Sequence, residues 1–193
     1  MPTPSRDEAW KLIEEWIQSD SLRRHLLGVE AGMRAYARKL DEDEELWGVV
    51  GLLHDLDYER YPDLDTGHPR KALELFEEKG YPQELIDAVA GHAEFMGVAR
   101  ETRLAKTLYA VDELSGFIAA CAMVRPTGIE GMKAKSVKKK LKQPSFAAGV
   151  NREEVQKGAE ELDADFDEHV EFVIEALEER AHDLGLAADQ QPG

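Results

Sequence analysis

Residues 46–56 read LWGVVGLLHDL, an apolar helical pattern that ends on the adjacent pair His54 and Asp55. The apolar residues recur at the three- and four-residue spacing of one helical face, which carries His54 toward a protein core. A buried ionisable group is unfavourable by several kcal/mol unless it is paired or binds a metal. The pair therefore indicates a metal site held by helices.

Four more ionisable residues lie in comparable settings along the chain. His25 falls among the apolar positions of a predicted helix over 22–40, and Asp112 lies on the apolar face of a later one. His68 opens a predicted helix, and His92 ends the next. Because an unpaired ionisable group is costly to bury, these four residues are also candidate metal ligands.

Each of these residues also has a structural interpretation. His25 alone would be a core histidine, His68 a helix cap, and His92 a cation favoured by the helix dipole. Asp112 alone would be the ion-pair partner of an arginine such as Arg103. The metal site is favoured because all six residues fall in one order between positions 25 and 112, and three of them are otherwise hard to bury.

The composition narrows the class of protein. The 193 residues, 42% hydrophobic and 33% charged, suit one globular domain with a sizeable core. The formal net charge of -16 argues against general nucleic-acid binding, because a phosphate backbone requires a basic surface. No apolar run is long enough to cross a bilayer, and no signal peptide is recognisable, so we expect a cytoplasmic protein without a membrane partner. Cys121 is alone, which excludes an internal disulfide.

Helix signals dominate the chain and strand signals are nearly absent, so we predict an all-α fold. Amphipathic stretches with capping residues predict helices at about 5–17, 19–40, 41–54, 68–80, 82–92, 102–124 and 165–184. A short helix over 136–142 and one capped by Asn151 lie between the last two of these.

We predict one domain over residues 1–185. Its motif core covers about 22–124, and a C-terminal helical extension covers about 126–185. No linker divides the chain convincingly. Residues 186–193 are predicted to be a disordered tail, because they carry no helical pattern.

The order of the ionisable residues resembles the HD superfamily of metal-dependent phosphohydrolases, in which a His, a His-Asp pair and a distant Asp lie on helices. Four residues match that signature and two match the extra histidines of dinuclear members, namely His25, His54, Asp55 and Asp112, then His68 and His92. The resemblance covers about residues 25–114. It implies a helical bundle of the HD type in which these six residues bind metal and Asp55 is the bridging, catalytic carboxylate.

The resemblance also implies a reaction. Members hydrolyse phosphate esters with a metal-activated water, so the expected substrate is a nucleotide or a small phosphomonoester. One or two divalent transition metal ions are expected. Four imidazoles make the site softer than magnesium prefers, which favours iron or manganese, with zinc, cobalt or nickel as alternatives.

The chain departs from many dinuclear relatives just after the His-Asp pair. They continue to a lysine that helps at the phosphate, whereas here the sequence runs through Asp57 to Arg60 without one. Asp57 is a candidate catalytic residue that orients a ligand histidine or a water, or else a surface acid at a helix end. The missing positive charge is expected from Arg60, Arg70 or the lysines of 133–142.

The segment 133–142, KAKSVKKKLK, has six lysines and no acids in an otherwise acidic chain. Such a run is most often a solvated surface. The alternative is an anion-binding patch, because a helix over 136–142 would place Lys138, Lys139 and Lys142 on one face. We predict that these lysines bind the substrate phosphate.

Two other functions fit the same ligand set. Some HD-fold proteins hold two irons with these ligands and cleave carbon bonds with dioxygen, here on a small anionic substrate. A non-catalytic regulatory module would keep the metal for stability alone. The lysine run favours a small phosphorylated substrate as the partner, and the sequence leaves a homo-oligomer open.

Overall fold

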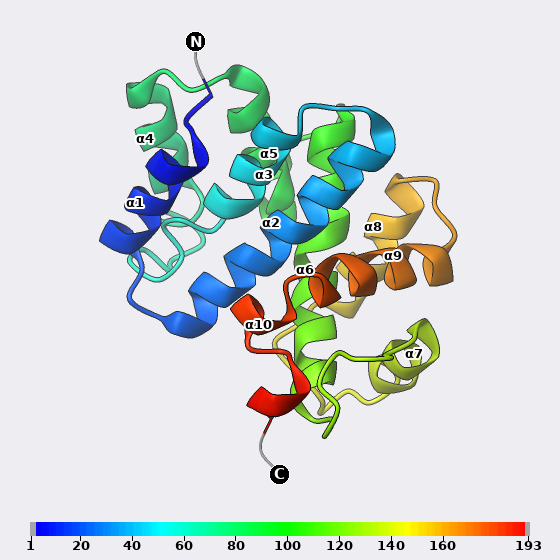
Figure 1. The fold of residues 1–193 in the computed structure, drawn as a ribbon. Coiled ribbons are helices and arrows are strands. Elements are labelled where there is room, and N and C mark those ends of the chain that lie inside the picture. The colour runs from blue at the N-terminus through cyan, green and yellow to red at the C-terminus, as the bar shows by residue number, and fades with distance from the viewer. Residues whose placement is uncertain (1–2, 192–193) are drawn as a thin grey trace.

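The computed structural model describes residues 3–191, and every regular element in that part of the chain is helical (Figure 1). The predicted all-α fold is confirmed. No helix of the described part is long and apolar enough to span a bilayer. The elements follow in the order α1 Arg6–Trp16, α2 Asp20–Leu40, α3 Glu44–Leu53, α4 Arg70–Lys79, α5 Gln83–His92, η1 Glu94–Met96, α6 Arg103–Met123, α7 Ala134–Leu141, α8 Arg152–Glu161, α9 Phe166–Glu178, α10 Ala181–Leu184 and η2 Ala188–Gln190.

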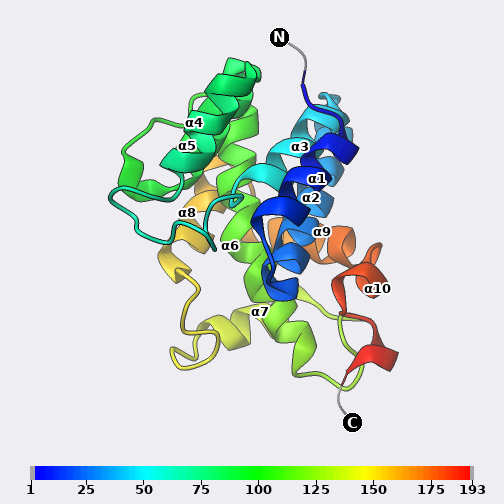
Figure 2. The same ribbon diagram turned by 90° about the vertical axis from the view of Figure 1, so that its left-hand side faces the viewer.

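Helix α6 runs through the middle of the molecule, and six helices of the described part pack on it: α2, α3, α5, α7, α8 and α9. Helices α4 and α5 lie on one side of α6, and α1, α2 and α3 lie on the other (Figure 2). Helices α8 and α9 also pack on α6, and α7 packs on α9 near the end of α6 that is lower in Figure 1. The buried apolar residues of these helices form one contiguous core, as a single domain requires.

Two glycines allow α2 to approach its neighbours closely. A Cβ atom at Gly32 would lie 2.5 Å from a methyl carbon of Val111 in α6. A Cβ atom at Gly51 in α3 would lie 3.0 Å from the backbone of Glu30 in α2. Neither position accepts a side chain unless the helices move apart. The three helices that carry most of the predicted ligands are therefore held at short distances.

Local sequence signals fix the helix boundaries. Ser5 and Glu8 form the predicted capping box at the start of α1, and the side chains of Ser19 and Asn151 cap α2 and α8. Gly80 ends α4 in the left-handed conformation that glycine adopts most readily. Each side-chain cap stabilises its helix by about 1 kcal/mol, because it satisfies backbone N–H groups that have no partner within the helix.

The last predicted helix, 165–184, is in fact two helices. Helix α9 ends at Glu178, and α10 begins at Ala181 after a turn. The buried face of α9 packs on α2, α6 and α7, whereas α10 packs on α2 and α9. The break therefore turns the chain back toward the start of α2.

The prediction of a disordered tail from residue 186 is wrong for the described residues 186–191. Leu186 is 2% exposed, and its carbonyl oxygen accepts a hydrogen bond of 2.9 Å from the backbone N–H of Ile129. Burial of this one leucine anchors a segment that has no helical pattern of its own. Residues 192–193 lie outside the described part of the chain.

His169 of α9 contacts α2 and α6, and we expect its burial to make the free energy of unfolding depend on pH. Its Nδ1 accepts a hydrogen bond of 2.6 Å from the Tyr36 hydroxyl, and its Nε2 lies 3.0 Å from the carbonyl oxygen of Ala110. Burial lowers the pKa of His169 below the ordinary value of 6.5. As the pH falls below about 6.5, the unfolded chain takes up this proton before the folded one, so the free energy of unfolding decreases.

Urea unfolding at several pH values between about 5 and 8 tests this prediction. The His169→Gln variant is expected to lose stability less steeply than the wild type toward acid. His182→Gln replaces an exposed imidazole and is expected to keep the wild-type slope. Equal slopes for all three proteins would contradict the assignment.

Candidate metal centre

Five segments of the chain bring the six predicted ligands together. α2 supplies one, the two residues that follow α3 supply two, and the turn before α4, the end of α5 and the middle of α6 supply one each: His25, His54, Asp55, His68, His92 and Asp112. Three of the histidines are nearly inaccessible, since His54 is 0%, His68 4% and His92 5% exposed. The helix packing around α6 thus gathers residues that are far apart in sequence.

The first group of donor atoms lies between α2, α3 and α6. The Nε2 atom of His25 is 3.3 Å from Nε2 of His54 and 3.1 Å from Oδ1 of Asp112. Oδ2 of Asp55 lies 3.6 Å from Nε2 of His54 and 3.8 Å from Nε2 of His25. Both imidazole nitrogens therefore lie within 3.8 Å of an oxygen of each of the two carboxylates.

The second group uses the other oxygen of the same aspartate. Oδ1 of Asp55 lies 3.5 Å from Nε2 of His68 and 3.4 Å from Nε2 of His92. The two imidazole rings also contact each other edge to face, with centroids 5.2 Å apart. Asp55 thus lies between two donor groups, with one oxygen facing each.

Hydrogen bonds on the far side of the rings orient three of the four histidines. Nδ1 of His54 donates to the carbonyl oxygen of Gly51 at 2.8 Å, and Nδ1 of His92 donates to the carbonyl oxygen of Val89. Nδ1 of His68 lies 2.8 Å from Oδ1 of Asp57. A proton on each Nδ1 leaves the Nε2 lone pair free for a metal, which is the tautomer that ligand histidines require.

Asp57 lies behind the donor atoms rather than in the space in front of them. It is 0% exposed, and its second oxygen accepts a hydrogen bond of 2.8 Å from the backbone N–H of Ala72 in α4. Of the two roles predicted for it, the structure places Asp57 where it orients His68. Its burial excludes the alternative of a surface acid at a helix end.

The charges of the first group favour a cation at its centre. Burial disfavours a charge on His54, but the carboxylates of Asp55 and Asp112 outweigh burial and raise the pKa of His54 to about 9. Burial also opposes the charge of both carboxylates, yet the nearby positive His54 lowers the pKa of Asp55 and Asp112. A proton or a metal ion therefore balances these anions, so the donor set fits a divalent metal in composition, orientation and charge.

A cleft of about 450 Å³ opens over the donor atoms. Its wall is formed by α6, η1, the start of α8 and the turn after α3. Besides the ligands, the lining residues include Tyr58, Leu64, Glu94, Phe95, Glu113, Val150, Asn151 and Glu154. No Lys or Arg of the described residues is among them. The cleft is large enough for a small molecule but offers it acidic rather than basic side chains.

Two glutamates in this wall, Glu113 and Glu154, have no basic partner among the described residues. Glu113 accepts a hydrogen bond of 3.1 Å from the backbone N–H of Asn151, and Glu154 accepts one of 2.6 Å from the Asn151 amide. Burial, and then the charge of Asp112, raise the pKa of Glu113 to about 7. Glu94 differs, because it pairs with Arg100.

The arginines predicted to hold phosphate point elsewhere. The guanidinium of Arg60 lies 4.6 Å from the centre of the Trp16 ring and donates to the carbonyl oxygen of Glu15. Arg70 donates to the carbonyl oxygen of Leu64 at 2.6 Å. Each satisfies a backbone group of its own neighbourhood, and neither lines the cleft.

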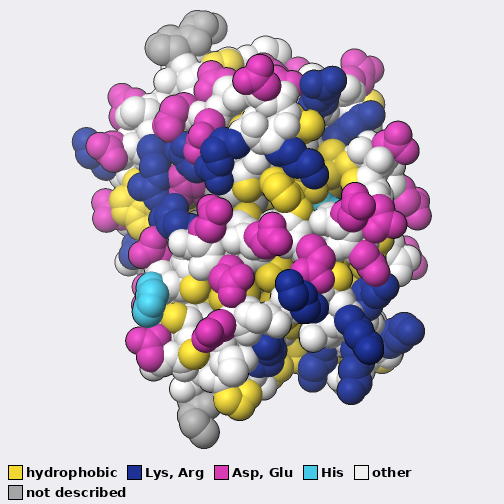
Figure 3. All heavy atoms as spheres, turned by 45° about the vertical axis from the view of Figure 1, so that its right-hand side comes forward, with side chains coloured by type: hydrophobic (Ala, Val, Ile, Leu, Met, Phe, Trp, Pro, Cys, Tyr) yellow, Lys and Arg dark blue, Asp and Glu magenta, His cyan; other side chains and the backbone are white. Residues whose placement is uncertain are grey.

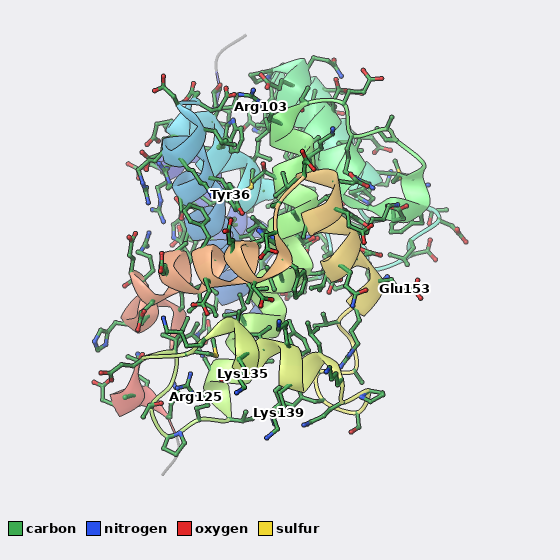
Figure 4. All side chains as sticks on the ribbon, turned by 90° about the vertical axis from the view of Figure 1, so that its right-hand side faces the viewer. Tyr36, Arg103, Arg125, Lys135, Lys139 and Glu153 are labelled. Carbon is green, nitrogen blue, oxygen red and sulfur yellow. The ribbon has the colours of Figure 1, made fainter. Side chains whose placement is uncertain are left out.

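The lysines of α7 are also away from the cleft. Lys138 pairs with Asp167 of α9 at 2.6 Å, and with Lys142 it lines a different cavity. Lys135 and Lys139 lie at the end of the molecule opposite to Arg103 (Figure 4). Figure 3 shows one group of lysine and arginine side chains at the lower right of the face and others across its upper half. Lys138, Lys139 and Lys142, which were predicted to bind phosphate, therefore do not line the cleft. Buried residues of α7 dock it on α9, and the docking sets where the lysines lie.

A family model of the HD domain matches residues 22–116. All six donor residues lie within that span. Residues 22–116 form an HD domain. HD domains belong to a superfamily of metal-dependent hydrolases, and the His and Asp groups here are able to hold such a metal. Neither the search of curated proteins nor the search of solved structures found a match.

The residues of the HD cleft that the sequence did not reveal are those of α8 and η1. Glu113 follows Asp112 directly, so its position next to the centre was available from helix geometry. Asn151 was predicted only as a helix cap. Glu154 lies one turn later, and its approach to the centre depends on how α8 packs on α6. A Cβ at Gly158 would lie 2.5 Å from the Ala110 backbone, which shows how close that packing is.

Proposed function

We propose that this HD protein is a metal-dependent phosphohydrolase that hydrolyses a small phosphate ester with water activated at the His/Asp centre. The observation that carries the proposal is the shared Asp55, whose two oxygens each face a separate donor group at the floor of an open cleft. Paired metal positions of this kind suit displacement at phosphorus, because attacking and leaving oxygens both develop charge.

The residues assign themselves to two positions. One ion would be held by His25, His54, Asp112 and one oxygen of Asp55. A second ion would be held by His68, His92 and the other oxygen of Asp55. A bound transition metal, iron or manganese above all, lowers the pKa of water and polarises the phosphoryl group. Asp57 keeps His68 in the ligand tautomer.

The acidic wall of the cleft supports a particular kind of substrate. Because the lining described above lacks Lys and Arg, the phosphate charge has to be balanced at the centre itself. Glu113 and Glu154 then face the rest of the substrate, where they accept hydrogen bonds from hydroxyl or ammonium groups. Further phosphates on the substrate would be repelled. We therefore propose a phosphomonoester with a polar, uncharged or cationic leaving group.

Turnover of a panel of phosphate esters by metal-reconstituted protein tests this function. We expect nucleoside monophosphates or small alkyl phosphomonoesters to be hydrolysed faster than nucleoside triphosphates. The same reactions with and without dioxygen separate hydrolysis from the alternative, a di-iron oxygenase. Release of phosphate that requires oxygen, or no phosphate release from any ester, would contradict the proposal.

If the second donor group binds metal, each chain holds two metal ions. His92→Ala removes one of that group's two imidazoles and leaves the first group intact, so the protein is expected to lose about one metal ion per chain and most of its activity. Elemental analysis and phosphate release measure the two effects. His182→Ala, on the exposed part of the chain, is the control. Unchanged metal content and activity in His92→Ala would show a single-ion centre with a structural His92.

A further inference from the structure

A second cavity, of about 260 Å³, meets the metal centre at His25 and Gly116, which line both spaces. It lies between α2, the second half of α6 and the C-terminal segment. Figure 1 shows α10 and the residues after it beside the first turns of α2. Most of its lining is apolar, from Gly28, Ala119, Ala120, Met123, Leu177, Leu184 and Leu186.

The C-terminal segment closes this cavity. Leu177, Leu184 and Leu186 all come from beyond residues 22–116, the part that matches the HD family. The burial of Leu186 that orders the end of the chain therefore also forms one wall of the cavity. A cavity of this kind, largely apolar with a few polar groups, has the general character of a small-molecule site.

The polar groups of the cavity are hydrogen-bond donors without partners. The Ser115 hydroxyl is buried, with the residue 2% exposed, and has no hydrogen-bond partner among residues 3–191. Arg24 is exposed at the rim of the cavity, and in the same part of the chain its guanidinium pairs with no carboxylate or carbonyl oxygen, so it is free to meet a ligand. Nδ1 of His25 also has no partner there, unlike Nδ1 of the other three ligand histidines. For the buried Ser115 hydroxyl the missing partner is unfavourable, and an acceptor oxygen from a ligand would remove that cost.

Gly116 leaves the two spaces open to each other. It lies inside α6, where glycine is less favourable than alanine. A Cβ atom there would meet His25 at 3.7 Å from Nδ1, an ordinary contact, so close packing does not require glycine. What the missing side chain provides is access to the Nδ1 face of His25.

We propose that this cavity binds a small anion with a short apolar body, whose oxygens accept hydrogen bonds from Arg24, Ser115 and the Nδ1–H of His25. The apolar lining takes the body of the ligand, and the three donors take its charged end. The ligand would accept a hydrogen bond from Nδ1 of His25 and orient its ring, as Asp57 does for His68. Because a partner on the outer nitrogen strengthens a ligand histidine, occupancy would increase metal affinity, and metal would increase affinity for the anion.

Calorimetric titration of the metal-free protein with octanoate, hexyl phosphate and octanol tests the proposal without any assumption about catalysis. We expect one or both anions to bind, and octanol to bind at least about tenfold more weakly because it lacks the charge. In the metal-free protein the acidic cleft does not attract these anions. The two anionic probes differ in their head group, so comparison of octanoate with hexyl phosphate shows whether the cavity prefers a carboxylate or a phosphate.

Variants locate the binding. Arg24→Met and Ser115→Ala are each expected to weaken binding of the anion, with about a tenfold loss for Arg24→Met. Arg38→Met removes an arginine from the exposed face of the same helix, where it pairs with Glu44, and should bind like the wild type. Ala120→Phe should fill the cavity and abolish binding. Urea unfolding verifies that each variant is folded.

Two results would overturn the proposal. One is the absence of anion binding up to about 10 mM, near the weak end of specific recognition. The other is binding that Arg24→Met and Ser115→Ala leave unchanged in folded protein. Failure of the phosphohydrolase assay would affect neither measurement, because both use metal-free protein.

Discussion

The Asp55→Ala protein is expected to carry almost no transition metal and to lose hydrolase activity on the order of 10³-fold. Among the described residues, Asp55 alone presents an oxygen to each donor group, so its removal weakens both metal positions at once. Elemental analysis of protein purified without chelator and then reconstituted gives the metal content. Phosphate release from the best ester of the panel gives the activity.

A surface carboxylate provides the matched comparison. Asp65→Ala removes an exposed aspartate from the turn that precedes α4, and both metal content and activity should stay at the wild-type level. Asp55→Asn keeps the shape of the side chain and removes only its charge, so it should resemble Asp55→Ala in metal content. Wild-type metal content in Asp55→Ala, or a metal-free wild type after reconstitution, would overturn the assignment of the centre.

The Glu30→Ala protein is expected to lose about 3–5 kcal/mol of its free energy of unfolding. Glu30 is 0% exposed in α2, and it accepts hydrogen bonds from Arg6 of α1 at 2.6 and 2.9 Å and from Arg34 at 3.0 Å. Its removal leaves Arg34, whose side chain is 13% exposed, without its buried partner. Denaturant unfolding measures the loss.

The exposed partner of the same arginine is the control. Glu45 also pairs with Arg34, at 2.7 Å, but its side chain is 68% exposed, so Glu45→Ala should cost less than about 1 kcal/mol. A similar small loss for Glu30→Ala would mean that solvent reaches the cluster and that α1 is held by apolar contacts alone.

The helices and the convergence of the donor residues were accessible from the sequence, because both depend on local patterns. Apolar spacing fixed which face of each helix is buried, and His25, His54 and Asp112 lie on those faces. Once the helices pack face to face, these side chains have to meet. The bridging place of Asp55 between two donor groups was implied by the resemblance, but which oxygen of Asp55 faces which histidine needed coordinates, since it depends on where the turn before α4 places His68.

The lysines and the tail show what local patterns leave undetermined. A run such as 133–142 reveals its charge but not its location, and the location follows from Val137, which is buried where α7 packs on α9. Lys138 then meets Asp167, far along the chain. The tail is held by the burial of Leu186 and Ala187 and by the side-chain amides of Gln190 and Gln191, none of which forms a periodic pattern.

The close contact at Gly32 has a consequence for how sequence variants of this protein would be interpreted. A side chain there would push against Val111, the neighbour of Asp112, and so spread α2 from α6. His25 and Asp112, which lie 3.1 Å apart across that same pair of helices, would separate with them. A variant with every donor residue intact could therefore behave in a genetic screen like the loss of a ligand.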